Sequence, residues 1–101
     1  MTTKKLTEKD IEMALCKRVK KLGGLCEKFS SPGRRSVPDR IVTLPVDYDD
    51  YCDYTIIFVE LKAPGKKPTK AQLKDHERRR ALGCEVRVID SLEQVEEFEW
   101  L

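Results

Sequence analysis

Residues 54–62 read YTIIFVELK, and this stretch decides the fold because it carries the strongest strand signal in the chain. β-Branched and aromatic residues dominate it, and apolar side chains fall on both faces, which is typical of a buried central strand. Alternation along a strand places Phe58, Glu60 and Lys62 on one face, with the last two about 7 Å apart. A carboxylate and an ammonium at the end of a buried strand are costly unless they are paired or bind something.

The segments on either side of this strand predict a small α/β domain. Thr7 begins a helix that Gly23-Gly24 ends, Pro45 ends a strand that follows Pro38-Asp39, and Thr69 begins a second long helix. The acidic run 46–54 predicts a hairpin connection. The expected elements are a helix over 7–22, strands over 25–29, 41–44 and 54–61, a helix over 70–82, a strand over 85–89 and a helical turn after residue 91. This order favours one domain over residues 1–101, with a central mixed β-sheet flanked by helices.

Length and composition limit the class of protein further. A chain of 101 residues and 11.7 kDa is large enough for one hydrophobic core but not for two. No apolar stretch approaches the roughly 20 residues that a membrane span needs, and no apolar signal-peptide core is visible, so we expect a cytoplasmic protein. The cysteines at positions 16, 26, 52 and 84 are too widely spaced for a usual zinc site, and we expect free thiols.

The charges of the chain are unevenly distributed, although the net charge is only +2. The charged residues of segments 1–46 and 62–82 are mostly basic, whereas those of segments 47–61 and 83–101 are mostly acidic. If the two basic segments converge, they form a positive surface that suits phosphates. The alternative is that these lysines and arginines only solvate helix faces. Clusters such as Arg34-Arg35 and Arg78-Arg79-Arg80 favour a polyanionic partner.

Pro38-Asp39 and Glu60-Leu61-Lys62 form the constellation that carries chemistry. Asp39 begins the strand next to Glu60, and two neighbouring carboxylates repel unless a divalent cation such as Mg²⁺ or Mn²⁺ lies between them. The carbonyl of Leu61 can add a third oxygen. Such a cation polarises a scissile phosphate and activates a water molecule, while Lys62 orients that water or stabilises charge on the phosphate. The alternative is a simple salt bridge of Glu60 at the end of the strand.

These motifs resemble those of the PD-(D/E)XK nuclease superfamily and, more closely, those of a stand-alone VRR-NUC domain, the virus-type replication-repair nuclease module. The resemblance covers about residues 8–92 and implies a restriction-endonuclease-like core. The stretches that carry it are Ile11-Glu12-Met13-Ala14-Leu15, Gly23-Gly24-Leu25, Ser31-Pro32-Gly33, Val37-Pro38-Asp39-Arg40, Phe58-Val59-Glu60-Leu61-Lys62-Ala63-Pro64-Gly65-Lys66-Lys67-Pro68, Gln72 and Leu82-Gly83-Cys84-Glu85-Val86-Arg87-Val88-Ile89-Asp90.

The resemblance adds two residues to the expected catalytic set of Asp39, Glu60 and Lys62. Family members carry a glutamate on the first helix that reaches the metal through water. Glu12 matches it best, and Glu8 is the alternative one turn earlier. Family members also carry a glutamine early in the second helix, which Gln72 matches.

Basic residues beside the two motif ends are the expected phosphate contacts, namely Arg34, Arg35, Lys66, Lys67 and Lys70. His76 lies one helical turn after Gln72, and we interpret it as an ordinary helix histidine, with contact to DNA or a place near the site as the alternative. Two features depart from the family pattern. Ser36-Val37 replaces the glycine that many relatives have before Pro38-Asp39, and the 46–54 connection is longer and more acidic. We expect this acidic connection to lie away from the substrate, at a subunit contact.

The resulting expectation is a metal-dependent, structure-specific DNA endonuclease of phage or bacterial origin. The resemblance implies action on branched DNA, with four-way (Holliday) junctions in DNA repair as the leading substrate. Cutting a two-fold symmetric junction needs two active sites, which predicts a homodimer. Two alternatives remain. One is a non-catalytic DNA-binding module of a replication or recombination complex, and the other is a nuclease that acts on linear duplex.

Overall fold

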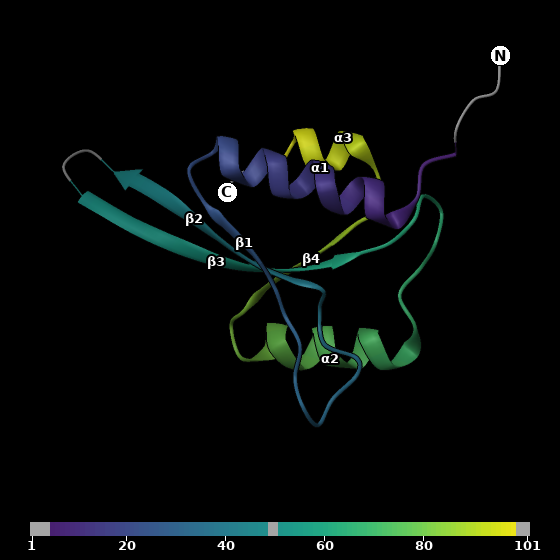
Figure 1. Ribbon diagram of the computed structural model, residues 1–101. Coiled ribbons are helices and arrows are strands. Elements are labelled where there is room, and N and C mark those ends of the chain that lie inside the picture. Colours follow the sequence, from purple (N-terminus) through teal and green to yellow (C-terminus); the bar gives the residue numbers. More distant parts are fainter. Residues whose placement is uncertain (1–4, 49–50, 99–101) are drawn as a thin grey trace, which may run out of the picture.

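A four-stranded mixed sheet forms the centre of the computed structural model, which describes residues 5–48 and 51–98 (Figure 1). The strands lie side by side in chain order, with β1–β2 and β2–β3 antiparallel and β3–β4 parallel. Their bounds are Leu25–Lys28 for β1, Arg40–Tyr48 for β2, Tyr51–Leu61 for β3 and Glu85–Ile89 for β4. The predicted mixed α/β architecture and the predicted order of elements are confirmed.

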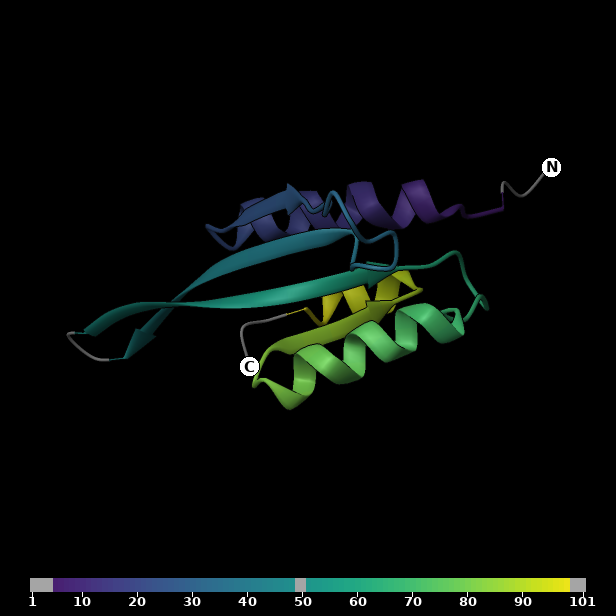
Figure 2. The ribbon, with the colours of Figure 1, turned by 90° about the horizontal axis from the view of Figure 1, so that it is seen from below.

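Two helices cover one face of the sheet and one helix covers the other (Figures 1 and 2). α1 (Glu8–Lys21) and α3 (Leu92–Glu96) pack together on the first face, and α2 (Lys70–Ala81) lies on the second. Because β3 and β4 are parallel neighbours, α2 forms the crossover connection between them on this face of the sheet. No helix in the described part of the chain is long and apolar enough to cross a membrane.

Local sequence explains where α1 begins and ends. The Thr7 side chain accepts a hydrogen bond from the N–H of Asp10, and the Asp10 carboxylate accepts one from the N–H of Thr7, which is a capping box. The helix ends before Gly23, whose φ of +86° suits glycine. Gly24 then passes close to β2, where a Cβ atom would lie 2.3 Å from the Thr43 carbonyl oxygen. This close approach requires glycine at position 24.

The hydrophobic core lies between the sheet and the α1–α3 layer. On α1, the apolar side chains of Ile11, Leu15 and Val19 are completely buried. Burying each such side chain contributes about 1.5–3 kcal/mol. The other members of the core come from β2, β3, β4 and the C-terminal segment, and they are Val42, Leu44, Ile57, Val59, Leu61, Ile89, Val95 and Phe98. The face of the sheet under α2 differs, because the buried residues of α2 are Asp75 and His76.

β2 and β3 extend beyond the rest of the sheet as a two-stranded ribbon, which projects to one side in Figure 1. Two boundary predictions are corrected here, because β2 does not end at Pro45 and β3 begins at Tyr51 rather than Tyr54. Pro45 is tolerated inside β2 because β1 pairs with β2 only as far as Thr43, so one side of Pro45 has no neighbouring strand. The expected acidic connection over 46–54 is therefore mostly strand, and its residues 49 and 50 lie outside the described part.

Candidate active site

Asp39 lies where the chain enters β2, and the backbone of neighbouring segments holds it from several sides. Its N–H donates to the carbonyl of Val59 at 3.0 Å, and its carbonyl accepts from the N–H of Phe29 at 3.0 Å. Its Oδ2 atom accepts a hydrogen bond of 2.7 Å from the N–H of Leu61. These bonds fix the Asp39 carboxylate at the end of β3, next to Glu60.

Glu60 is almost completely buried, with an exposed fraction of 1%, and α2 supplies partners for both of its carboxylate oxygens. Gln72 Nε2 donates to Oε2 at 3.3 Å, and His76 Nε2 lies 3.2 Å from Oε1. The amide of Gln72 has a fixed orientation, because its Oε1 accepts from the N–H of Thr69 in the capping box of α2. The orientation leaves the NH₂ group of Gln72 facing Glu60.

The electrostatic environment of Glu60 favours a bound proton. Its pKa is raised from 4.5 to about 8, first by burial and then by the hydrogen bond with Asp39 and the negative charge of that residue. The charge of Lys62 opposes this rise only in part. Two neighbouring carboxylates are unfavourable when both are ionised and buried. A bound cation between them would neutralise this repulsion.

The two candidate glutamates of α1 lie in different surroundings. Glu12 Oε2 is 3.0 Å from Arg40 Nε, so Glu12 is engaged in a salt bridge with the first residue of β2. The pKa of Glu8 is raised by burial and by the negative charges of Asp39 and Glu12, and lowered by the charge of Lys62. Glu8 is therefore close enough to Asp39 and Lys62 for their charges to affect it, whereas Glu12 is paired with Arg40.

Lys62 continues the face of β3 that carries Glu60. Its backbone N–H donates to the carbonyl of Ile89 at 3.0 Å, so the pairing of β3 with β4 extends to this position. Its side chain is half-buried, and its positive charge lowers the pKa of both Glu60 and Glu8. The structure thus brings Asp39, Glu60, Lys62 and Gln72 together, with Glu8 near them.

The residues expected to contact phosphates are mostly exposed. Arg35, Lys66, Lys67 and Lys70 lie on the surface. Arg34 is also exposed, but its Nη2 atom lies 3.1 Å from Asp75 Oδ1 and forms an ion pair with α2. This pair attaches the loop before Asp39 to the helix that carries Gln72.

Sequence reasoning missed two residues that shape this region and misjudged a third. The first is Asp75, which is 2% exposed and whose Oδ2 atom lies 2.7 Å from Arg79 Nε. The second is Arg79, whose guanidinium lies over the rings of Phe29 and Phe58. His76 is not an ordinary helix histidine, because it is completely buried against Glu60. The available signal was spacing, since residues 72, 75, 76 and 79 share one face of a helix.

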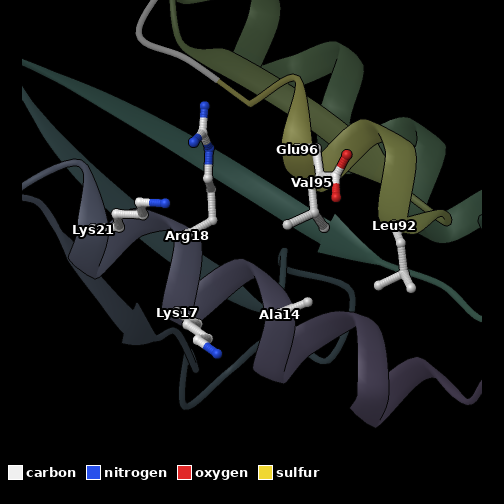
Figure 3. A pocket seen from close by; sticks show the side chains of 7 residues that line it. All are labelled: Ala14, Lys17, Arg18, Lys21, Leu92, Val95 and Glu96. Atoms are coloured by element: carbon white, nitrogen blue, oxygen red, sulfur yellow. The ribbon is translucent and has the colours of Figure 1, made fainter.

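A groove between α1 and α3 is separate from these carboxylates (Figure 3). None of the predicted site residues lines it. Its lining consists of Ala14, Lys17, Arg18, Lys21, Leu92, Val95 and Glu96.

Comparison with known proteins supports a relationship to nucleases. The chain is 52% identical, over 86 residues, to a protein named "Putative nuclease p44" from Acyrthosiphon pisum secondary endosymbiont phage 1, with 85% of each chain covered. A solved structure described as a VRR_NUC domain is 36% identical and superposes with a TM-score of 0.77, covering 91% of this chain and 94% of that one. No family model matches the chain.

Proposed function

Because the chain belongs to the VRR-NUC family of nucleases, we propose that it hydrolyses phosphodiester bonds of branched DNA with Mg²⁺ or Mn²⁺ at the Asp39–Glu60 pair. The observation that carries this proposal is the contact between these two carboxyl groups beside Lys62 at the end of β3. A structural salt bridge does not explain the contact, since Asp39 and Glu60 carry charge of the same sign.

The donor set suits a divalent cation that keeps part of its water shell. Within residues 5–48 and 51–98, no group of three or more His, Cys, Asp or Glu side chains is arranged to enclose a metal ion. Mg²⁺ does not need such a cage, because it commonly binds one or two carboxylates together with waters and substrate phosphates. Asp39 and Glu60 supply two carboxylates, and we assign the carbonyl of Leu61 as a further oxygen ligand.

A bound cation would supply charge to polarise the scissile phosphate and would lower the pKa of an attacking water. The residues of the chain have separate parts in this proposal. Asp39 and Glu60 are the ligands, and the Leu61 N–H fixes the Asp39 carboxylate through its 2.7 Å hydrogen bond. Lys62 stabilises negative charge on the phosphate, and Gln72 holds Glu60 in place.

We assign Glu8, rather than the Glu12 favoured by sequence, as the glutamate of α1 that reaches the metal through water. The support is electrostatic and geometric. Glu8 is influenced by the charges of Asp39 and Lys62, whereas Glu12 is paired with Arg40. A carboxylate already bound to a guanidinium is less available to a second cation.

The DNA backbone would contact the exposed cations near the site, which are Arg35, Lys66, Lys67 and Lys70. Arg34 would contribute less, because Asp75 already balances its charge. The support for branched DNA is the family relationship. A four-way junction has two-fold symmetry, so we propose a homodimer that presents one active site to each of two strands.

Cleavage of end-labelled DNA tests the proposal directly. A four-way junction, a flap, a single strand and a linear duplex are each incubated with Mg²⁺, Mn²⁺ or EDTA. Asp39→Asn and Lys62→Ala are compared with control substitutions of exposed residues, Glu27→Gln and Lys20→Ala. We expect metal-dependent cutting of the junction that both site substitutions abolish and both controls retain.

Other outcomes would favour the alternatives. Cutting of linear duplex alone would retain the active site and change the substrate. Binding without cutting in any metal would favour a non-catalytic DNA-binding module. Light scattering after gel filtration tests the dimer separately, and a monomer at micromolar concentration would contradict it.

A further inference from the structure

α2 packs against the sheet through polar side chains, which is unusual for a helix that covers a sheet. Its fully buried positions are Asp75 and His76, and the exposed fraction of His76 is 0%. An apolar residue at a buried helix position would pack without any cost of removing polar atoms from water. The buried imidazole of His76 therefore needs an explanation other than packing.

The contacts of His76 point toward Glu60. Its Nε2 atom lies 3.2 Å from Glu60 Oε1, and the other carboxylate oxygen accepts from Gln72 Nε2 at 3.3 Å. Residues 72 and 76 are four apart, so they lie one helical turn from each other on the same face of α2. The two side chains together hold the carboxylate at both oxygens.

The hydrogen-bond pattern also indicates which nitrogen of His76 carries the proton. Nδ1 is buried and has no hydrogen-bond partner among the described residues. A proton on Nδ1 would bury an unpaired N–H donor, whereas a proton on Nε2 donates to Glu60. The network thus favours the neutral imidazole with its proton on Nε2.

We propose that His76 is a positioning residue for Glu60, which its Nε2–H orients for cation binding. The inference rests on the proposed function, in which Glu60 is a metal ligand. A donor that holds a ligating carboxylate sets the direction of its free lone pairs, and loss of such an outer partner commonly weakens metal affinity about 10–100-fold. His76 acts through Glu60 and does not itself contact DNA, because it is completely buried.

Three substitutions separate positioning from packing. His76→Leu fills the space of the imidazole with an apolar side chain that has no hydrogen-bond donor. His76→Gln places an amide donor near the position of Nε2. Glu77→Leu introduces the same leucine at an exposed position of α2. Mn²⁺ binding is measured by calorimetry, and the melting temperature is measured on the metal-free proteins.

We expect His76→Leu to bind Mn²⁺ about 10–100-fold more weakly and to melt below the wild type, because Glu60 Oε1 loses its buried donor. His76→Gln should recover most of the affinity, and Glu77→Leu should bind as the wild type does. Junction cleavage by His76→Leu should fall at low Mn²⁺ and recover when Mn²⁺ is raised. Wild-type affinity in His76→Leu would overturn the role of His76 and leave the proposed nuclease centre intact.

A second measurement needs no substitution, because His76 is the only histidine of the chain. Proton–nitrogen correlation spectra of the imidazole in the wild-type protein report the protonated nitrogen. We expect the neutral form with the proton on Nε2, with and without Mg²⁺. A proton on Nδ1 would overturn the inference even if His76→Leu fails to fold. Mn²⁺ binding that is absent, or that survives Asp39→Asn, would overturn the metal centre itself and the role of His76 with it.

Discussion

Arg40 Nε lies 3.0 Å from Glu12 Oε2, and this salt bridge attaches the middle of α1 to the first residue of β2. Arg40 also donates from Nη1 to the carbonyl of Cys26 in β1 at 3.1 Å. Three elements therefore meet at one guanidinium. The arrangement distinguishes the two α1 glutamates, because Glu12 is paired with Arg40, whereas the charges of Asp39 and Lys62 influence the pKa of Glu8.

Substitution of the two glutamates should have different effects. Glu8→Gln is expected to lower junction cleavage about 10–100-fold, because it removes a charge that we place in the outer shell of the metal. Glu12→Gln is expected to lower the free energy of unfolding by about 1–3 kcal/mol, because it weakens the partner of a half-buried guanidinium. Cleavage assays and urea unfolding measure the two effects. The reverse pattern would return the metal role to Glu12.

The contribution of Glu60 to the stability of the metal-free protein should fall as the pH rises. The pKa of Glu60 is raised from 4.5 to about 8 by burial and by Asp39, so the folded state retains a proton that the unfolded chain loses. The stabilising contribution of this proton is complete below pH 4.5 and is lost as the pH rises to about 8. Urea unfolding at several pH values in EDTA measures it.

The matched variant for this test is Glu60→Gln, which has no carboxyl group to titrate. Its free energy of unfolding should change less over the same pH range. Added Mg²⁺ should stabilise the wild type more at pH 8 than at pH 6, because the cation and the proton compete for the same carboxylates. The same pH dependence in the wild type and in Glu60→Gln would contradict the prediction.

Cys16 and Cys26 should form a disulfide under mild oxidation. Their sulfur atoms lie 3.2 Å apart, and the bond would join α1 to β1. The pKa of Cys26 is raised to about 12 by burial and by Cys16, so the Cys26 thiolate is scarce at neutral pH and the reaction should accelerate as the pH rises. The crosslink should add about 2–3 kcal/mol to the free energy of unfolding.

Thiol counting and peptide mass mapping after treatment with oxidised glutathione measure this reaction. Cys16→Ser should prevent the intramolecular crosslink and leave Cys84 available, which the structure shows as a free thiol. Crosslinks that join Cys84 to either residue instead would contradict the geometry described above.

Removal of the Asp75 charge should destabilise the fold strongly. Asp75 is 2% exposed and pairs with both Arg34 and Arg79, so Asp75→Asn leaves two guanidinium groups without their anion. We expect a loss of about 3 kcal/mol in urea unfolding. Arg34→Gln should cost about 1 kcal/mol or less, because the Arg34 side chain is 44% exposed and Arg79 still pairs with Asp75. Equal losses for the two variants would refute this ranking.

Much of the fold was predictable because the decisive signals are local. The apolar run of β3, the capping residues Thr7 and Thr69 and the glycines after the helices determined the order of elements. The ends of β2 and β3 were predicted wrongly because Pro45 ends a strand only where a neighbour needs its missing N–H. β1 pairs with β2 only as far as Thr43, so Pro45 has no partner on that side. The sequence around Pro45 contains no information about the length of β1.

The proposed site was predictable where a motif combined with strand geometry, as for Asp39 and Glu60. The choice between Glu8 and Glu12 was not, because they lie one turn apart and their environments depend on where Arg40 points. His76 was misjudged for a related reason. A single polar residue on a helix carries no sign of whether the opposite side chain is a carboxylate.

The pairing register of the β2–β3 ribbon determines which residue of β3 lies beside Asp39. Nine residue pairs connect Arg40↔Val59 to Tyr48↔Tyr51, and the Asp39 side chain, one residue before Arg40, accepts a hydrogen bond from the N–H of Leu61. A slip of one residue would turn each side chain of the slipped strand to the opposite face of the sheet. Insertion of one residue in a single arm of the ribbon must therefore be absorbed as a β-bulge if Asp39 is to stay beside Glu60, whereas loss of one residue from each arm keeps the register.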